Sequence, residues 1–260
     1  MGHYTNKKIW ITGASSGIGA AAARALSKEG AVLLLSARRE DALESVRNSC
    51  AHPEKVHILK ADIEQAESEA AGWIEAALEK LGGLDLFLAN AGIGQSGTAL
   101  ETRNEVERKL FEINYHGHIA LTKLVLRHFL HQKSGQITAI GSIAGKFGQK
   151  KLAAYSASKA ALILYYESLR QEHKNDPVRL QVVSPGFINT EVTLNSLDAE
   201  GNKLNKNSPA QEKGMPADVF AKKLLKAMQK DRFHIYIGGK ELLAVPLHSL
   251  APGIFYRLLG

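Results

Sequence analysis

Short apolar runs alternate with longer segments of helical spacing along most of the chain. The runs are rich in Val, Ile and Leu, which suits strands of a sheet that is covered on both faces. In a segment such as 18–30, Gly30 is a typical helix C-cap. The pattern predicts seven buried strands, at residues 8–12, 31–36, 55–59, 84–89, 135–141, 178–184 and 233–237.

This alternation predicts one doubly wound α/β domain of the Rossmann type. Strand–helix–strand units with right-handed crossovers give a parallel sheet with helices on both faces. No linker or change in composition interrupts the pattern before about residue 190, so residues 1–260 are interpreted as a single domain. Residues 190–216 are polar and irregular, and a loop of this length suggests a segment that closes over a substrate.

The C-terminal quarter carries most of the positive charge. The net charge is +7, and residues 201–260 contain 10 Lys/Arg against 4 Asp/Glu. A solvated basic face explains this charge, and the alternatives are attraction to anionic ligands or to an acidic membrane surface. A basic helix is expected at about 217–230. The tail over 241–260 is apolar but interrupted by Pro246 and Pro252, and three roles remain open for it: covering a neighbouring subunit, closing the pocket or touching a membrane.

Composition also narrows the classes of function. The single cysteine, Cys50, excludes an internal disulfide and fits a reducing, cytoplasmic compartment. Neither a secretory signal nor a membrane-spanning helix is expected, because no apolar leader and no run of about 18 apolar residues is present. Zinc-finger spacing and basic–aromatic arrays are absent from the sequence, and the ten histidines suggest no third metal ligand. We therefore expect neither nucleic-acid binding nor a metal site.

A glycine-rich turn between the first strand and the first helix predicts a dinucleotide site. Gly13 would allow the tight turn, Gly17 the close approach of a phosphate, and Gly19 the packing of the helix on the sheet. A pyrophosphate would rest at the helix N-terminus, where free N–H groups favour an anion. The spacing is G-x-x-x-G-x-G, and a purely structural turn is the alternative. The residues of this turn that are predicted to bind the cofactor also include Ser15, Ser16 and Ile18.

Two arginines at the end of the second strand predict the phosphorylated form of the cofactor. Chains that hold the ribose 2′-hydroxyl of NAD usually place Asp or Glu here. This chain has Arg38 and Arg39 instead, and a guanidinium binds a phosphate through two parallel hydrogen bonds. NADP(H) is therefore preferred over NAD(H). The alternative is that both arginines are solvated at the start of a helix.

A tyrosine, a lysine and a serine form the candidate catalytic set. Tyr155 and Lys159 are four residues apart in an Ala-rich helical segment, so they share one face. A tyrosine ordinarily titrates at about pH 10, and a nearby ammonium would lower the pKa of Tyr155 and make it usable as a general acid/base. Ser142 ends the fifth strand at the carboxyl edge of the sheet, where its hydroxyl would hydrogen-bond a carbonyl or alkoxide.

Taken together, these motifs resemble the short-chain dehydrogenase/reductase family over about residues 7–237. Asn114 matches the fourth member of that family's catalytic tetrad. Asp62 resembles the family's adenine-contacting Asp, with Ile63 beside it. The motifs that match in order are the glycine turn at 12–19; Asn90, Ala91 and Gly92 after the fourth strand; Ser142 with the Tyr155–Lys159 pair; and Pro185 and Gly186 followed by Thr190.

The resemblance implies a role for each matched position. Tyr155 would give or take the hydroxyl proton, while Lys159 would lower its pKa and bind the nicotinamide ribose. Ser142 would orient the carbonyl, and Asn114 would hold a water in a proton relay. The residues implied to bind the cofactor further along the chain are Asn90, Ala91 and Gly92, which would line the cleft, and Pro185, Gly186, Ile188 and Thr190, which would contact the nicotinamide end.

The sequence thus predicts an NADP(H)-dependent oxidoreductase that transfers a hydride between the nicotinamide and a small carbonyl or alcohol. The apolar tail favours a hydrophobic substrate over a sugar. A nucleotide-sensing protein without chemistry and a membrane-peripheral scaffold are the alternatives, and the intact tetrad argues against the first. The resemblance also implies a homodimer or homotetramer, and peripheral membrane contact remains open. Phe147, Phe187 and Leu194 lie near the catalytic segments, where pocket lining and core packing are both open.

Overall fold

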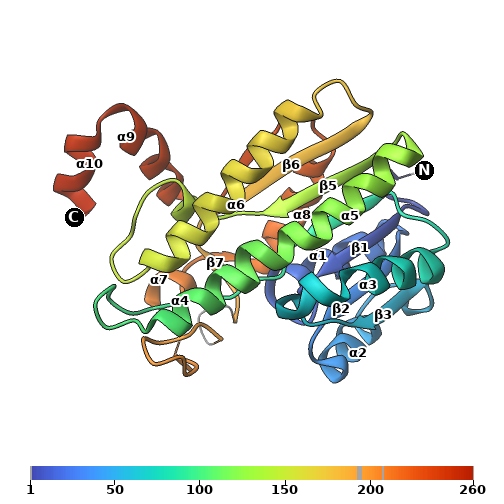
Figure 1. Cartoon of the computed structure of the whole chain (residues 1–260), viewed down its shortest axis with the longest axis horizontal. Coiled ribbons are helices and arrows are strands. Elements are labelled where there is room, and N and C mark those ends of the chain that lie inside the picture. Colours follow the sequence, from blue (N-terminus) through green and yellow to red (C-terminus); the bar gives the residue numbers. More distant parts are fainter. Residues whose placement is uncertain (1, 192–194, 207, 260) are drawn as a thin grey trace.

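Parallel strands form the sheet at the centre of the molecule (Figure 1). The structure is a computed structural model and describes residues 2–191, 195–206 and 208–259. The sheet has seven strands in the order β3-β2-β1-β4-β5-β6-β9 within this described part. Their bounds are Lys8–Thr12 (β1), Val32–Ala37 (β2), Val56–Lys60 (β3), Leu86–Ala89 (β4), Gly135–Ile140 (β5), Val178–Pro185 (β6) and His234–Ile237 (β9).

All the predicted strands are present, and the order of the strands explains where a ligand can bind. The chain runs outward from β1 to β3 and then returns to place β4 on the other side of β1. The loops after β1 and β4 therefore diverge at the carboxyl edge of the sheet and leave a crevice between them. This confirms the doubly wound fold.

Helices cover both faces of the sheet (Figure 1). Ile9 and Leu33 belong to one buried cluster, whereas their neighbours Trp10 and Leu34 belong to the other. Successive side chains of a strand point to opposite faces, so both faces are buried and the apolar runs are continuous. The helices are α1 (Gly17–Lys28), α2 (Glu40–Asn48) and α8 (Ala217–Met228) on the first face, and α3 (Ala66–Leu81), α5 (Gly117–Gln132) and α6 (Ala153–Glu172) on the second.

Helix ends differ slightly from the predicted ones. The helix predicted over 18–30 ends at Lys28, and Gly30 follows the C-cap residue with a φ of 81°. The N–H of Gly30 donates to the Ser27 carbonyl at 2.9 Å. Gly30 therefore supplies the left-handed turn that ends a helix, as expected of a glycine at this position. The shorter helical turns are η1 (Pro53–Lys55), η2 (Ile63–Gln65) and η4 (Ile143–Gly145).

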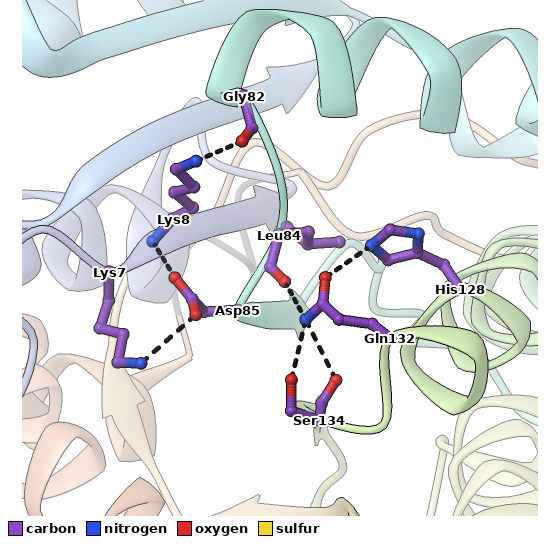
Figure 2. A network of polar contacts seen from close by, with 8 residues as sticks. All are labelled: Lys7, Lys8, Gly82, Leu84, Asp85, His128, Gln132 and Ser134. Atoms are coloured by element: carbon purple, nitrogen blue, oxygen red, sulfur yellow. Dashed lines mark hydrogen bonds and ion pairs between the residues drawn. The ribbon is translucent and has the colours of Figure 1, made fainter.

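The amino edge of the sheet, opposite the crevice, is joined by polar contacts (Figure 2). Asp85, just before β4, accepts a hydrogen bond from the Lys8 backbone N–H at 2.8 Å and pairs with the Lys7 ammonium at 3.3 Å. At the end of α5, Gln132 donates to the carbonyls of Leu84 and Ser134. These contacts connect the starts of β1, β4 and β5 on the side of the sheet away from the crevice.

The segment predicted as an irregular loop has short elements of its own. The two-residue strands β7 (Ile188–Asn189) and β8 (Met215–Pro216) pair with each other, and α7 (Pro209–Glu212) lies between them in the chain. Leu197 forms isolated bridges with Gln95 and Lys203. The segment is therefore anchored both to itself and to the loop after β4.

The C-terminal tail is helical and lies beside the rest of the fold at the left of Figure 1. It consists of η5 (Lys240–Leu243), α9 (Ala244–Leu250) and α10 (Pro252–Leu259). Phe255 of α10 is buried against Phe147 of the loop after η4, with ring centroids 5.0 Å apart. The tail thus packs on the loop that follows Ser142. No helix in the described part of the chain is both long and apolar enough to cross a membrane.

Candidate active site

A cavity of about 530 Å³ lies at the carboxyl edge of the sheet, in the crevice between the loops after β1 and β4. Its lining includes every predicted site residue except Gly19 and Asn114. Both of these residues are buried. The sequence motifs, which are spread over more than 170 positions of the chain, therefore converge on one cavity and its immediate support.

The glycine turn has the geometry that a close-fitting ligand requires. Gly13 and Gly17 have φ values of 63° and 54°, in the left-handed region that favours glycine. A Cβ on Gly13 would lie 2.7 Å from the Ala91 Cα, and one on Gly19 would lie 2.6 Å from the Asn90 amide nitrogen. Ser16 occupies the N-cap of α1 but makes no side-chain capping bond among the described residues. The first turn of α1 therefore opens toward the cavity without a side-chain cap.

Thr12, the first residue of the glycine-turn motif, has a role that the sequence did not assign to it. Its Oγ1 accepts hydrogen bonds from the backbone N–H groups of Asn90 and Ala91, at 3.0 and 3.1 Å. In return, the Asn90 amide donates to the carbonyls of Thr12 and Gly13. This exchange fixes the glycine turn to the end of β4. In the sequence, the position of Thr12 directly before Gly13 was the signal that could have pointed to this role.

Arginines and an aspartate line the part of the cavity next to β2 and β3. Arg38 and Arg39 are exposed and follow β2, and Arg39 is the N-cap of α2. Asp62 follows β3, and its carboxylate accepts a hydrogen bond from the Glu64 N–H at 3.2 Å. Ile63 lies beside it on the cavity wall. This region can therefore offer two positive charges to an anion and an apolar side chain to a base.

The catalytic candidates come together at the other side of the crevice. Lys159 is 4% exposed, and its ammonium donates to the Ile140 carbonyl at 3.0 Å. Ser142 accepts a hydrogen bond from the Ala144 N–H at 3.1 Å, which caps η4 and fixes the serine side chain. Tyr155 and Lys159 lie one turn apart on α6, and both line the cavity together with Ser142.

The pKa of Tyr155 shifts in the opposite direction to the one expected. Burial raises the pKa of Tyr155 above its ordinary value, and a hydrogen bond with the Ser142 side chain opposes this only in part. Burial also lowers the pKa of Lys159 to about 8. Loss of solvent around the phenol is the largest of these effects. A lowering of the Tyr155 pKa by Lys159 stays a prediction.

Asn114 lies behind the cavity in a π-helical turn. The turn η3 (Glu112–His116) joins α4 (Asn104–Phe111) to α5 in one continuous helix. The Asn114 side chain accepts from the Ile93 N–H at 2.8 Å and donates to the Ile93 carbonyl at 2.9 Å and to Ser158 at 3.2 Å. Such turns are frequent at functional sites. Here the turn connects the loop after β4 to the helix that carries Tyr155.

His118 is a buried histidine that contacts the loop after β4. It is 1% exposed, and its Nε2 shares a hydrogen bond with the Ala91 carbonyl. Its Nδ1 has no partner among the described residues. Burial, followed by the nearby Lys159 charge, lowers the pKa of His118 to about 4. The imidazole is therefore neutral near pH 7, and the ring donates through Nε2.

The lowered pKa of His118 predicts that the folded protein loses stability in acid. An unfolded histidine titrates at about 6.5, so as the pH falls from there toward 4 the unfolded chain takes up a proton that buried His118 does not. The free energy of unfolding should fall by about 3 kcal/mol from this group over that window. Denaturant unfolding at a series of pH values should show a shallower decline for His118→Gln. The exposed His116 provides the control, since His116→Gln should keep the wild-type slope. Equal slopes for His118→Gln and wild type would contradict the prediction.

The segment over 195–211 closes one side of the cavity with mostly polar residues. Phe187 also lines the cavity, whereas Phe147 does not and packs on Phe255. Leu194 lies outside the described residues. The residues of the segment that line the cavity are Asn195, Ser196, Lys203, Leu204, Ser208 and Gln211.

Comparisons with known proteins show the family to which the chain belongs. A family model described as short chain dehydrogenase matches residues 7–201. A dehydrogenase/reductase SDR family protein 7-like of Anopheles gambiae is 35% identical over 266 residues, which cover 99% of this chain and 83% of that protein. The dehydrogenase/reductase SDR family member 7 of Homo sapiens is 34% identical, over 93% of this chain and 73% of that protein.

Solved structures share the fold. A short-chain dehydrogenase/reductase from Burkholderia phymatum in complex with NAD superposes with a TM-score of 0.86 at 24% identity, covering 98% of this chain and 96% of that one. The closed form of a serine dehydrogenase complexed with NADP+ gives a TM-score of 0.80 at 18% identity, covering 88% and 94%. The family model spans well over half of the sequence, and the curated relatives match almost all of it, so the chain belongs to the short-chain dehydrogenase/reductase family.

Proposed function

We propose that the protein is an NADP(H)-dependent oxidoreductase that interconverts a carbonyl and an alcohol. One observation carries the proposal: a single cavity reaches from Ser142, Tyr155 and Lys159 to Arg38 and Arg39. The strands that precede these two groups, β5 and β2, are three positions apart in the sheet, or about 14 Å. A dinucleotide lying across the switch point would place its two ends in these two regions.

The residues of the cavity fit this cofactor. The left-handed turn at Gly13 and Gly17 brings the backbone close to the open N-terminus of α1, which suits a pyrophosphate. Arg38 and Arg39 would hold a 2′-phosphate, and Asp62 and Ile63 would contact the adenine. NADP(H), when bound, supplies the hydride chemistry, and the protein supplies binding and orientation. The remaining proposed cofactor contacts are Ser15, Ser16, Ile18, Gly19, Asn90, Ala91, Gly92, Pro185, Gly186, Ile188 and Thr190.

Tyr155 is the proposed general acid/base. Because burial raises its pKa, the side chain is a protonated phenol near neutral pH and can donate its proton to a carbonyl oxygen. Ser142, which hydrogen-bonds the same phenol, would orient that oxygen. Lys159 is mostly protonated near pH 7 and would bind the ribose while it returns a proton to Tyr155. Asn114 would hold the water of this proton relay. Its side chain also accepts a hydrogen bond from the Ile93 N–H in the loop after β4.

Other parts of the proposal concern the substrate and the assembly. Residues 190–216 would form the substrate loop of the single domain, and its lining side chains suggest a pocket that is less apolar than the tail alone implied. Exposed Leu164 on α6 and exposed Leu250 and Leu258 on the tail support a homodimer or homotetramer. The same tail leucines would suit peripheral contact with a membrane.

Oxidation of NADPH and of NADH over a panel of ketones, aldehydes and quinones tests the proposed function. Turnover that requires NADPH is the expected result, and the panel then begins to identify the substrate class. No turnover across the panel, together with stabilisation of the fold by NADPH, would favour a nucleotide-sensing protein instead.

A further inference from the structure

Glu241, at the start of the C-terminal tail, contacts the segment that follows β6. One carboxylate oxygen, Oε1, accepts a hydrogen bond from the Phe187 backbone N–H at 3.0 Å and another from the Gly239 N–H at 2.8 Å. Phe187 is 54 positions earlier in the chain. The side chain therefore joins the ends of two neighbouring strands, β6 and β9, at the carboxyl edge of the sheet.

Three glycines make the space that this carboxylate occupies. A Cβ on Gly238 or Gly239 would lie 2.6 or 2.9 Å from a Glu241 oxygen, and a Cβ on Gly186 would overlap Oε1 outright. The Gly186 N–H also donates to the Ile237 carbonyl at 2.9 Å, so the two backbones are already close. Glycines that follow the two strands thus form a cradle around the Glu241 carboxylate.

The cradle lies directly next to the cavity. Pro185, Gly186, Phe187 and Ile188 all line the cavity, and Gly186 and Phe187 also contact Glu241. Loss of the acceptor would leave the Phe187 N–H without its side-chain partner and leave the Gly186 N–H as the bond that ties this stretch to the end of β9. Since small displacements of positioning elements reduce activity strongly, a contact outside the cavity can control the geometry inside it.

We propose that Glu241 is a positioning residue that holds the Gly186–Ile188 backbone at the nicotinamide end of the cofactor site. This inference rests on the proposed function, which assigns that end of the cavity to the nicotinamide. It extends the proposed function because Glu241 belongs to the tail and does not line the cavity itself. It also makes the junction between β9 and the tail part of the catalytic geometry.

A matched pair of variants separates positioning from general damage. Both hydrogen bonds end on Oε1, so Glu241→Gln keeps the acceptor, whereas Glu241→Ala removes it. Exposed Lys240 next to it provides the surface control Lys240→Ala. The affinities to be measured, by calorimetry on the full chain, are those for NADPH and for adenosine 2′,5′-bisphosphate, which lacks the nicotinamide half. For any substrate that the panel identifies, steady-state kinetics of the same variants gives kcat and KM separately.

We expect Glu241→Ala to weaken the affinity for NADPH by about tenfold and to lower kcat by a similar factor. The affinity for the bisphosphate should stay within about twofold of wild type. Glu241→Gln and Lys240→Ala should behave like wild type. Wild-type affinity of Glu241→Ala for NADPH would overturn the inference, and so would an equal loss for both ligands. If wild type binds NADPH but turns over no substrate, the proposed function fails, while the two affinities still decide the role of Glu241.

Discussion

Tyr155→Phe should lower turnover at least about a hundredfold while NADPH still binds. The substitution removes only the phenolic oxygen, which is the atom that would transfer the proton. It leaves the ring, which packs against the buried cluster of Val106, Leu110, Ala154 and Leu197. Turnover and NADPH affinity should be measured on the same preparation, so that loss of chemistry is separated from loss of the cofactor site.

Tyr165→Phe is the matched control for this variant. Tyr165 lies on the same helix, is half-buried and contacts the Tyr115 ring, but it does not line the cavity. It should retain wild-type turnover. Activity that survives in Tyr155→Phe would show that another group supplies the proton and that Tyr155 is not the general acid/base.

Arg38→Ala should weaken NADPH binding by about tenfold to a hundredfold and change NADH binding by no more than about twofold. A hydrogen bond to a charged group contributes about 1.5–3 kcal/mol, and only NADPH carries the 2′-phosphate that would receive it. The exposed position of Arg38 on the cavity wall places the measurement at the lower end of this range. Direct titration with both nucleotides gives the two affinities.

Arg47→Ala tests whether the effect is local. Arg47 lies on α2, pairs with Glu44 and does not line the cavity, so its loss removes the same charge at a different place. It should leave both nucleotide affinities close to wild type. Equal losses of NADPH and NADH affinity in Arg38→Ala would remove the case for a 2′-phosphate contact.

The strands were predictable because burial on both faces makes them continuous apolar runs. The run at 84–89 shows the limit: Leu84 is as buried as Leu86, yet β4 begins only at Leu86. Composition records burial, whereas a strand begins where backbone pairing begins. The motifs were predictable for a related reason, because ligand-binding loops follow strands at one edge and the strand pattern places them there.

The tail was harder to predict because its prolines were interpreted as interruptions. Pro252 is instead the first residue of α10, a position where its missing N–H costs nothing. Pro246 lies in the first turn of α9, for which the same reasoning holds. The contact of Phe255 with Phe147 holds α10 on the loop after η4, and a contact between such distant positions leaves no local pattern.

Two features of the site also depend on tertiary structure. The spacing of Tyr155 and Lys159 correctly placed them on one face, but the direction of the Tyr155 pKa shift depends on burial, which spacing does not report. The bonds of Glu241 join two strand ends that only the folded sheet brings together. Sequence therefore identified which residues meet, and the structure identified what holds them there.

The π-helical turn at Asn114 makes chain length, as well as residue identity, a determinant of the site. A π turn holds more residues than an α turn, so deleting a single codon between Glu112 and His116 would allow an ordinary helix to form there. Because an α turn needs one residue fewer than a π turn, α4 and α5 would keep nearly the same orientation, but the residues of the turn itself would be displaced. Asn114 would then lose its hydrogen bonds with Ile93. A change of length in this turn would therefore disturb the site even if every remaining side chain kept its identity.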